Sequence, residues 1–271
     1  MSTVYFDVEG EENTTEALTL GFERAMALDI GVLAVASTRG GSGFTALRLS
    51  RELGFTGRVI VVGEHYGYHR PDGQEMMSET IERLRAEGAE VVFGTHALSG
   101  VERSYRFRHG GISTLEIMSE VLRRFSRGVK TAVEISVMLA DAGAVSVDRD
   151  LVAAGGSGGG IDSVIVLRPA SSNRFFDLKV REFIAYPRAR MSEVAERVIR
   201  LYQTSEYNEV SLANAAGCSV ASVQRFVREF EAVRAGFARG ASLEEVCREI
   251  QRGRNTVTMY VELEQNLDER T

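Results

Sequence analysis

The sequence contains only two cysteines, Cys218 and Cys247, and both lie in apolar stretches with helical spacing. Isolated thiols in such positions are typical of small, reduced core residues, so neither a disulfide nor a cysteine metal site is expected. No signal peptide opens the sequence, and no apolar run reaches the roughly 20 residues that span a membrane. We therefore expect a cytoplasmic protein without a membrane partner.

The acidic and basic side chains are nearly balanced. With 38 acidic and 32 basic residues the formal net charge is −6, which argues against non-specific coating of nucleic acid but leaves a local basic surface open. Hydrophobic residues make up 44% of the chain and charged residues 26%, as in ordinary globular proteins. A length of 271 residues suits two domains or one large domain.

Several familiar catalytic and metal-binding patterns are missing. No lysine follows the glycines in the spacing of a Walker loop, and no nucleophile–base pair or carboxylate pair stands out. The spacing of the histidines matches no standard zinc motif, which favours hydrogen bonding to a polar ligand over metal binding. These residues are His65, His69, His96 and His109, all expected in loops. Nothing in these patterns argues for catalysis.

Short β-branched runs alternate with helical stretches up to about Pro187. This alternation predicts a parallel or mostly parallel sheet with helices on both faces. After Arg188 the strand patterns stop and amphipathic helices follow, so we place one domain at residues 1–188 and a small all-α domain at residues 191–271. The expected strands are 32–37, 59–62, 91–93 and 163–167, and the expected helices are 14–28, 45–53, 75–87, 114–125 and 129–141.

A dense polar loop is expected after the strand at 91–93. Residues 94–104 supply hydroxyls, the imidazole of His96, the carboxylate of Glu102 and the guanidinium of Arg103. Ligands of open α/β sheets bind at the carboxyl ends of the strands, which makes this loop a candidate ligand-binding segment. The alternative is an ordinary surface loop with helix caps.

A glycine-rich loop joins the first predicted buried strand to a helix. Backbone N–H groups and the helix N-terminus at residues 37–46 would attract an anion, helped by hydroxyls and by Arg39. The hydroxyl donors are Ser37, Thr38, Ser42 and Thr45. The sequence therefore predicts a phosphate site, with a plain tight turn as the alternative. The loop also matches a Gly-x-Gly-x-x-Ala dinucleotide pattern with Glu64 after the next strand, but this match is weak.

Two further features have more than one interpretation. The glycine cluster at 155–160 is expected to form a tight turn facing a ligand, although a short linker is the alternative. Glu134 lies in an otherwise apolar helical stretch, so it either faces solvent or is buried against a partner such as Arg103.

Short segments spread over residues 1–188 together resemble a known family. They are Tyr5-Phe6, Asn13-Thr14, Ala36-Ser37-Thr38, Ser42-Gly43-Phe44-Thr45-Ala46, Gly73-Gln74-Glu75-Met76, Thr95-His96-Ala97-Leu98-Ser99-Gly100-Val101-Glu102-Arg103, Val133-Glu134-Ile135, Ala140-Asp141-Ala142-Gly143, Gly155-Gly156, Arg168-Pro169-Ala170, Asn173 and Phe175-Phe176-Asp177. The chain is similar to small archaeal proteins with the fold of the pyruvate kinase C-terminal domain.

The resemblance implies a three-layer α/β/α domain with a mostly parallel five-stranded sheet, and flavin mononucleotide (FMN) as a ligand. Carried over to this sequence, the phosphate would be held by Ser37, Thr38, Ser42, Gly43 and Thr45. The rest of the pocket would be lined by Thr95, His96, Gly155, Gly156 and Ser157. A longer first loop, with Arg39-Gly40-Gly41 inserted, departs from the family pattern and leaves the ligand open.

The C-terminal domain lies outside that resemblance and contains a helix-turn-helix pattern. Ala213 is the small residue where two helices would cross, and Gly217 is the turn glycine. The second helix would present Ser219, Gln224, Arg225 and Arg228 to DNA. A weaker second copy has its glycine displaced to Gly253 and would present Arg252, Arg254, Asn255 and Thr258. The alternative is a helical bundle used for dimerisation.

These observations favour a ligand-responsive DNA-binding regulator that forms a homo-oligomer and whose α/β domain binds a phosphorylated small molecule. One alternative is an enzyme acting on a flavin or another phosphorylated metabolite through His96, Glu102 or Glu134, with the tail used for oligomerisation. Another is a carrier without chemistry of its own.

Overall fold

The computed structural model describes residues 2–157, 160–204, 208–250 and 254–268. Two compact units divide the chain, Met1–Arg188 and Ala189–Thr271, and each is described by itself. In the described part of the chain, no helix is both long enough and apolar enough to cross a membrane.

The first unit contains a mixed sheet with the strand order β1-β7-β6-β5-β2-β3-β4. Strands β5, β2, β3 and β4 are parallel neighbours, whereas β6 pairs antiparallel with both β5 and β7. The α/β class is confirmed, but the prediction of a mostly parallel five-stranded sheet is wrong. The strands are β1 (Val4–Val8), β2 (Val32–Ala36), β3 (Arg58–Glu64), β4 (Glu90–Gly94), β5 (Leu151–Gly155), β6 (Ser163–Arg168) and β7 (Lys179–Ala189).

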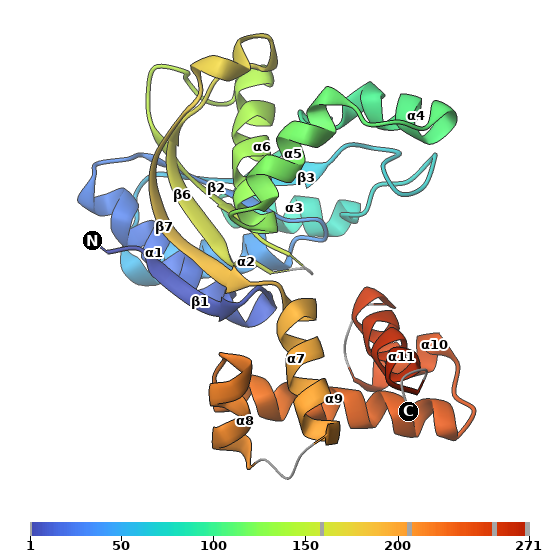
Figure 1. The fold of residues 1–271 in the computed structure, drawn as a ribbon. Helices are drawn as coiled ribbons and strands as arrows, with labels where there is room; N and C mark the ends of the chain where they lie inside the picture. The colour runs from blue at the N-terminus through green and yellow to red at the C-terminus, as the bar shows by residue number, and fades with distance from the viewer. Residues whose placement is uncertain (1, 158–159, 205–207, 251–253, 269–271) are drawn as a thin grey trace. The chain divides into compact units, whose positions relative to one another are not determined.

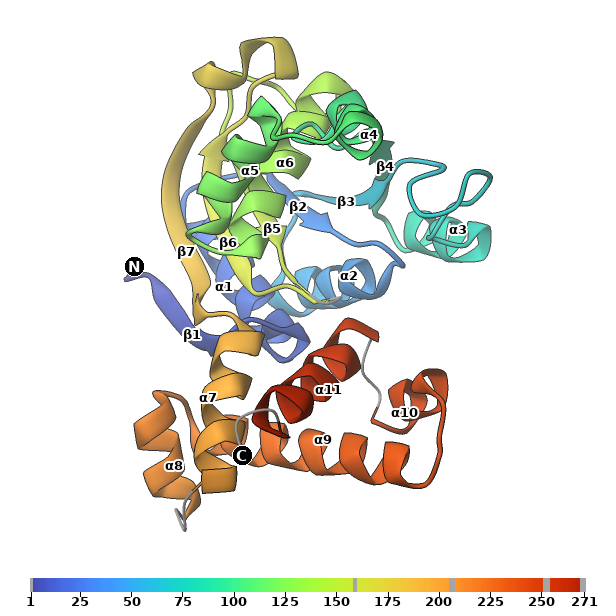
Figure 2. The ribbon, with the colours of Figure 1, turned by 45° about the vertical axis from the view of Figure 1, so that its right-hand side comes forward.

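Helices cover both faces of this sheet (Figures 1 and 2). Because successive strand residues point to opposite faces, Leu33 and Val35 pack toward α1 and α2, whereas Ala34 packs toward α6. The helices of this unit are α1 (Thr14–Ala27), α2 (Gly41–Leu53), α3 (Ser78–Ala86), α4 (Gly100–His109), α5 (Thr114–Arg123) and α6 (Arg127–Asp141), with short 3₁₀ turns at Glu11–Asn13 and Ser172–Asp177.

Two predicted loops are shorter than expected. The polar segment after β4 becomes helical at Gly100, so Glu102 and Arg103 lie on α4 and His109 is the last residue of that helix. The glycine-rich segment after β2 likewise ends early, because α2 begins at Gly41. Gly40 precedes it with φ of 97°, a left-handed conformation that glycine adopts without steric cost. In both places the polar residues that suggested a loop occupy the first helical turns.

The second unit is helical throughout its described residues. Helices α7 and α8 pack against α9 and against each other, and so do α10 and α11. Buried side chains such as Val198, Leu212, Phe226, Val246 and Tyr260 form its core. The helices are α7 (Met191–Thr204), α8 (Glu209–Ala216), α9 (Val220–Ala238), α10 (Leu243–Glu249) and α11 (Arg254–Asp268).

Candidate functional site

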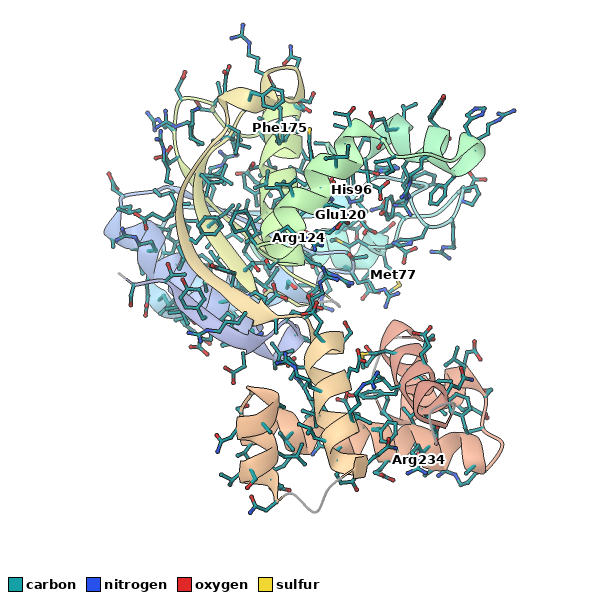
Figure 3. All side chains as sticks on the ribbon, viewed as in Figure 1. Met77, His96, Glu120, Arg124, Phe175 and Arg234 are labelled. Carbon is teal, nitrogen blue, oxygen red and sulfur yellow. The ribbon has the colours of Figure 1, made fainter. Side chains whose placement is uncertain are left out.

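A cavity of about 510 Å³ opens at the carboxyl ends of β2, β3 and β4, beside α6. This is the edge where open α/β sheets bind ligands, and the volume falls in the range of small-molecule pockets. Figure 3 shows His96 in this region, near helix α5. The polar residues of the cavity wall are Ser37, Thr38, Glu64, Tyr68, His96, Ser99, Arg103, Arg106, Ser113, Glu116, Ser119, Arg123, Lys130, Thr131 and Glu134.

Charged side chains dominate this wall. Two of its carboxylates pair with cations of the same wall, Glu116 with Arg106 and Glu134 with Lys130. The cations nevertheless outnumber the carboxylates, and they reach the cavity from three different helices. An anionic ligand is the chemistry that such a wall favours. The cationic residues are Arg103, Arg106, Arg123 and Lys130, and the carboxylates are Glu64, Glu116 and Glu134.

Lys130 and Glu134 form a buried ion pair on α6. Their side chains are only 11% and 3% exposed, and Nζ of Lys130 lies 2.5 Å from Oε2 of Glu134. The other carboxylate oxygen of Glu134 accepts the backbone N–H of Leu98 at 3.1 Å. Burial lowers the pKa of Lys130, although the neighbouring Glu134 opposes that shift. The partner of Glu134 is thus Lys130, and the suggested pairing with Arg103 is wrong.

His96 follows β4 and contacts the aromatic rings of the loop after β3. Its ring centroid lies 4.5 Å from that of Tyr68 and 5.9 Å from that of His65. Burial is the main cause that lowers the pKa of His96, so the imidazole is neutral near pH 7. Within the described residues its buried Nδ1 has no hydrogen-bond partner. A polar ligand in the cavity would therefore find an available ring nitrogen.

Helices α4 and α5 supply the arginines of the opposite wall. The guanidinium of Arg103 lies 4.6 Å from the centre of the Tyr68 ring and also donates to the Tyr68 hydroxyl. Arg106 pairs with Glu116 at 2.5 Å. Glu102 accepts the backbone N–H of Leu115 at 3.0 Å, at the start of α5. Glu102 therefore joins the two helices and is not among the residues that line the cavity.

The predicted phosphate loop contributes only its first two hydroxyl residues to the cavity. Ser37 and Thr38 line it, and Ser37 Oγ also accepts the N–H of Gly40 at 3.1 Å. Ser42 is buried inside α2, while Thr45 donates to the carbonyl of Gly41 at 3.3 Å. Neither lines the cavity, and nor does Gly43.

Gly43 has a packing role in the structure. A Cβ atom at this position would lie 2.9 Å from a methyl group of Val61, which is too close for any larger residue without movement. Arg39 is largely exposed and lies 4.0 Å from Glu75, outside the cavity wall. Gly43 is thus required for the close packing of α2 on β3. This packing explains a glycine in the loop without any bound anion.

The second predicted segment, around residues 155–160, borders the cavity through Gly156 and Gly160. Gly155 lies against α6, since a Cβ there would come within 2.3 Å of the Gly128 carbonyl oxygen. The Ser157 hydroxyl points elsewhere and donates to Asp162 at 2.8 Å. Thr95 is exposed and does not line the cavity. Residues 158 and 159 lie outside the described part.

Asp162 holds this glycine segment in place through hydrogen bonds. Its carboxylate accepts hydrogen bonds from the backbone N–H of Gly10 at 3.2 Å and from the Ser163 hydroxyl at 2.7 Å. It also accepts hydrogen bonds from the backbone N–H and the hydroxyl of Ser157. Burial raises the pKa of Asp162 to about 6 despite these hydrogen bonds. Asp162 does not line the cavity, so we assign it a role in the fold and not in ligand binding.

The histidines do not assemble a metal site in the described chain, where no cluster of three or more His, Cys, Asp or Glu side chains has suitable geometry. His69 pairs with Glu64 at 3.0 Å, and His109 ends α4 without lining the cavity. Neither Cys218 nor Cys247 forms a disulfide in the described part of the chain, and both are half-buried.

In the second unit, α8 and α9 are joined by a turn in which Gly217 has φ of 70° and Ser219 caps α9. Ser219, Gln224 and Arg228 are exposed near the start of α9, and Gln224 donates to Glu209 at 2.7 Å. Arg225 is half-buried, with its guanidinium 4.6 Å from the centre of the Phe226 ring. The helix therefore presents three of the four predicted side chains openly to solvent.

The second predicted copy is described only in part. Thr258 is exposed on α11. Arg252 and Gly253 lie outside the described residues, as do the side chains of Arg254 and Asn255. Val246, Val257 and Tyr260 are buried, so the apolar positions of this copy belong to the helical core.

A search with models of known protein families finds none that matches this chain. The resemblance to proteins with the pyruvate kinase C-terminal fold therefore stays a prediction from sequence.

Sequence reasoning missed the basic residues of the cavity wall. Lys130 and Arg123 were not singled out because they lie within predicted helical stretches and not in loops. Arg106 was not singled out because it follows the polar segment 94–104, on a helix that no apolar periodicity marks. One signal was present: Lys130 and Glu134 are four residues apart, the spacing that brings opposite charges together on a helix.

Proposed function

We propose that the protein is a ligand-responsive DNA-binding regulator. In this proposal the cavity of residues 1–188 binds a phosphorylated small molecule, and the helical unit binds DNA. The observation that carries the first half is the convergence of four cationic side chains on one cavity at the carboxyl edge of the sheet. Ligand binding would change DNA affinity only if the ligand binds the DNA-bound and free states unequally.

FMN is the first candidate ligand, as the sequence resemblance implies. Its phosphate carries negative charge, which suits the cationic wall and the hydroxyls of Ser37 and Thr38. Its ring system would need an apolar or aromatic surface and polar edge contacts. Tyr68 and the unpartnered Nδ1 of His96 are suitable groups on the same wall.

DNA binding is supported by the α8–α9 arrangement. Two helices joined by a short glycine turn match the helix-turn-helix motif, in which the N-terminal residues of the second helix contact base edges. Gln224 and Arg228 are exposed there, and both residue types make specific contacts with bases or phosphates.

A homo-oligomer is supported by an apolar stripe on α5. Ile117 and Val121 on α5, and Phe125 two residues beyond its end, lie at successive four-residue intervals and are all exposed in the single chain. Glu120 and Arg124, which Figure 3 labels, are exposed neighbours of these residues in the sequence and pair with each other at 3.0 Å. Antiparallel pairing of two α5 helices would set acidic side chains of one copy against basic side chains of the other. We propose this face as the dimer interface.

The first test is the absorbance spectrum of the purified protein, followed by mass spectrometry of any molecule that heat releases. Flavin bands with the mass of FMN, or saturable binding when FMN is titrated in, are expected. Release of a different phosphate ester would support the cavity as a ligand site but would show that FMN is not its ligand. An empty protein that binds neither FMN nor inorganic phosphate would overturn the ligand proposal.

The DNA half is tested by selecting bound sequences from random duplexes, then measuring affinity with and without FMN. Replacing Gln224 and Arg228 together by alanine should weaken specific binding by about 1–3 kcal/mol for each base that these side chains recognise. Arg239→Ala, at the other end of α9 and paired with Glu249, is the matched control. Unchanged affinity in the double variant, or an equal decrease in the control, would refute the assignment of α9 as the recognition helix.

A further inference from the structure

The basic residues of this chain are almost all arginines. Lysine occurs only at positions 130 and 179, so nearly every surface ion pair uses a guanidinium. Lys179 is exposed on β7, whereas Lys130 is buried and lines the cavity. A lysine thus stands at the cavity position where the cation is most enclosed.

The two residue types differ in what they can do when buried. A guanidinium stays charged in proteins and is a poor nucleophile, whereas the ε-amine of lysine can lose its proton and attack a carbonyl carbon. The amine must be reachable by a ligand, close to a proton acceptor and disposed to be neutral. Lys130 meets these conditions in the structure.

The proton acceptor is Glu134. Its Oε2 lies 2.5 Å from Nζ of Lys130, and its Oε1 is fixed by the N–H of Leu98, so the carboxylate is held in place. Burial together with the charges of Arg123 and Arg103 works to lower the pKa of Lys130. The same arginines border the cavity and attract anions to the amine.

We infer that Lys130 forms an imine with anionic aldehydes or ketones that enter this cavity. The ammonium of Lys130 first gives a proton to Glu134, and the nitrogen lone pair then attacks the carbonyl carbon. The carbonyl oxygen takes one proton from the attacking nitrogen and a second from Glu134, and it leaves as water. Glu134 is again a carboxylate, and the ammonium and the carbonyl compound have given a protonated imine plus one water. No oxidant or reductant takes part.

This inference rests on the proposed binding of phosphorylated ligands in the cavity but not on FMN being one of them. It names a class, phosphorylated carbonyl compounds, whose phosphate the arginines would hold while the carbonyl reaches Nζ. Lys130 and Glu134 both border the ligand space, so a carbonyl compound held there can reach the amine and its proton acceptor.

The test uses pyridoxal 5′-phosphate, a phosphorylated aldehyde, on the flavin-free full-length protein. Borohydride reduces any imine to a stable secondary amine, and peptide mass spectrometry reports which lysine carries it. Because Lys179 is the only other lysine, it is an internal reference in the same sample. Because burial lowers the pKa of Lys130 and so favours its neutral amine, and because the arginines hold the phosphate beside it, labelling of Lys130 is expected to be severalfold faster than labelling of Lys179.

Two variants and one control ligand sharpen the result. Lys179→Arg should keep the labelling at residue 130, and Lys130→Arg should abolish it while leaving the circular dichroism spectrum unchanged. Pyridoxal, which lacks the phosphate, should label Lys130 far more slowly. Inorganic phosphate should compete.

Labelling of Lys179 as fast as Lys130 in the wild-type chain would overturn the inference without need of any variant. So would tight, saturable binding of pyridoxal 5′-phosphate with no reducible adduct, and that outcome would leave the phosphate site intact. Absence of both binding and labelling would instead refute the proposed ligand class, which separates the two failures.

Discussion

Glu134 holds the ammonium of Lys130 one helical turn away on α6, with 2.5 Å between nitrogen and oxygen and almost no solvent around either group. The pair is covered by the segment after β4, because the N–H of Leu98 donates to the same carboxylate. Helix α6, the cavity wall and the loop carrying His96 are thereby joined at one carboxyl group.

Removal of one partner should be costly. Glu134→Ala leaves a buried ammonium and an unpaired N–H of Leu98, so we expect the free energy of unfolding to fall by about 3–5 kcal/mol. Lys130→Met combined with Glu134→Leu removes both charges and should be much less destabilising. Urea denaturation at pH 7 measures both. A double variant as unstable as Glu134→Ala would contradict this account.

Asp162 makes stability depend on pH. Burial raises its pKa from 3.8 to about 6, so the folded protein binds this proton more tightly than the unfolded chain. The stabilisation from the protonated form is complete below pH 3.8 and decreases as pH rises to about 6, by a total of about 3 kcal/mol. Asp162→Asn, which keeps one oxygen acceptor, should not show this decrease.

The measurement is the unfolding free energy of both proteins from about pH 4 to about pH 7.5, the range that brackets the raised pKa of Asp162. The difference between them should shift in favour of Asp162→Asn as pH rises through 6. A difference that stays constant over this range would show that the carboxyl group titrates with an ordinary pKa.

Gly128 permits the close approach of α6 to the strands. A Cβ at this position would lie 2.4 Å from Oδ1 of Asp162 and 2.4 Å from Oγ of Ser163. We therefore expect Gly128→Ala to destabilise the fold by about 1–3 kcal/mol through overpacking. Gly31→Ala is the control, because no atom of the described residues lies within 4 Å of its Cβ position. Thermal unfolding of the two variants compares them directly, and equal midpoints would refute the packing argument.

The apolar stripe of α5 should govern self-association. Val121 is 59% exposed in the single chain, and Val121→Glu would place a charge at the centre of the proposed dimer interface. Sedimentation equilibrium should show a dimer for the wild type and a monomer for this variant. Phe176→Glu changes a side chain that is 84% exposed on another element and should leave the dimer unaffected. A wild-type monomer at high concentration would overturn the proposed interface.

Sequence periodicity found β2, β3, β4 and β6, which are rich in β-branched side chains and, apart from the half-buried β4, are mostly buried. It missed β5 because Leu151–Gly155 ends in two alanines and a glycine, which have little strand preference. It missed β7 because Lys179–Ala189 carries charges and Pro187, and many of its positions lie near solvent. The number of strands was therefore underestimated, because β5 and β7 have few of the buried β-branched side chains that mark a strand in the sequence.

Apart from Glu134 on α6, the predicted residues that line the cavity lie on segments that follow strand ends. Ser37, Thr38 and His96 were found because the carboxyl edge of a parallel sheet is where ligands bind. Lys130 and Arg123 come from helices, and their convergence with Arg103 depends on how α5 and α6 pack, which no local pattern encodes. Helix α4 was missed because it has no buried residue and so leaves no apolar periodicity in the sequence.

We expect α4 to control how ligands enter and leave the cavity. A ten-residue helix without a buried side chain contributes little to global stability, so its opening costs little free energy. Arg103 and Arg106 enter the cavity from α4, and a ligand that engages them must order the helix as it binds. We expect hydrogen exchange in α4 to slow markedly when ligand is bound. We therefore expect changes that stabilise α4 to lengthen the lifetime of the complex.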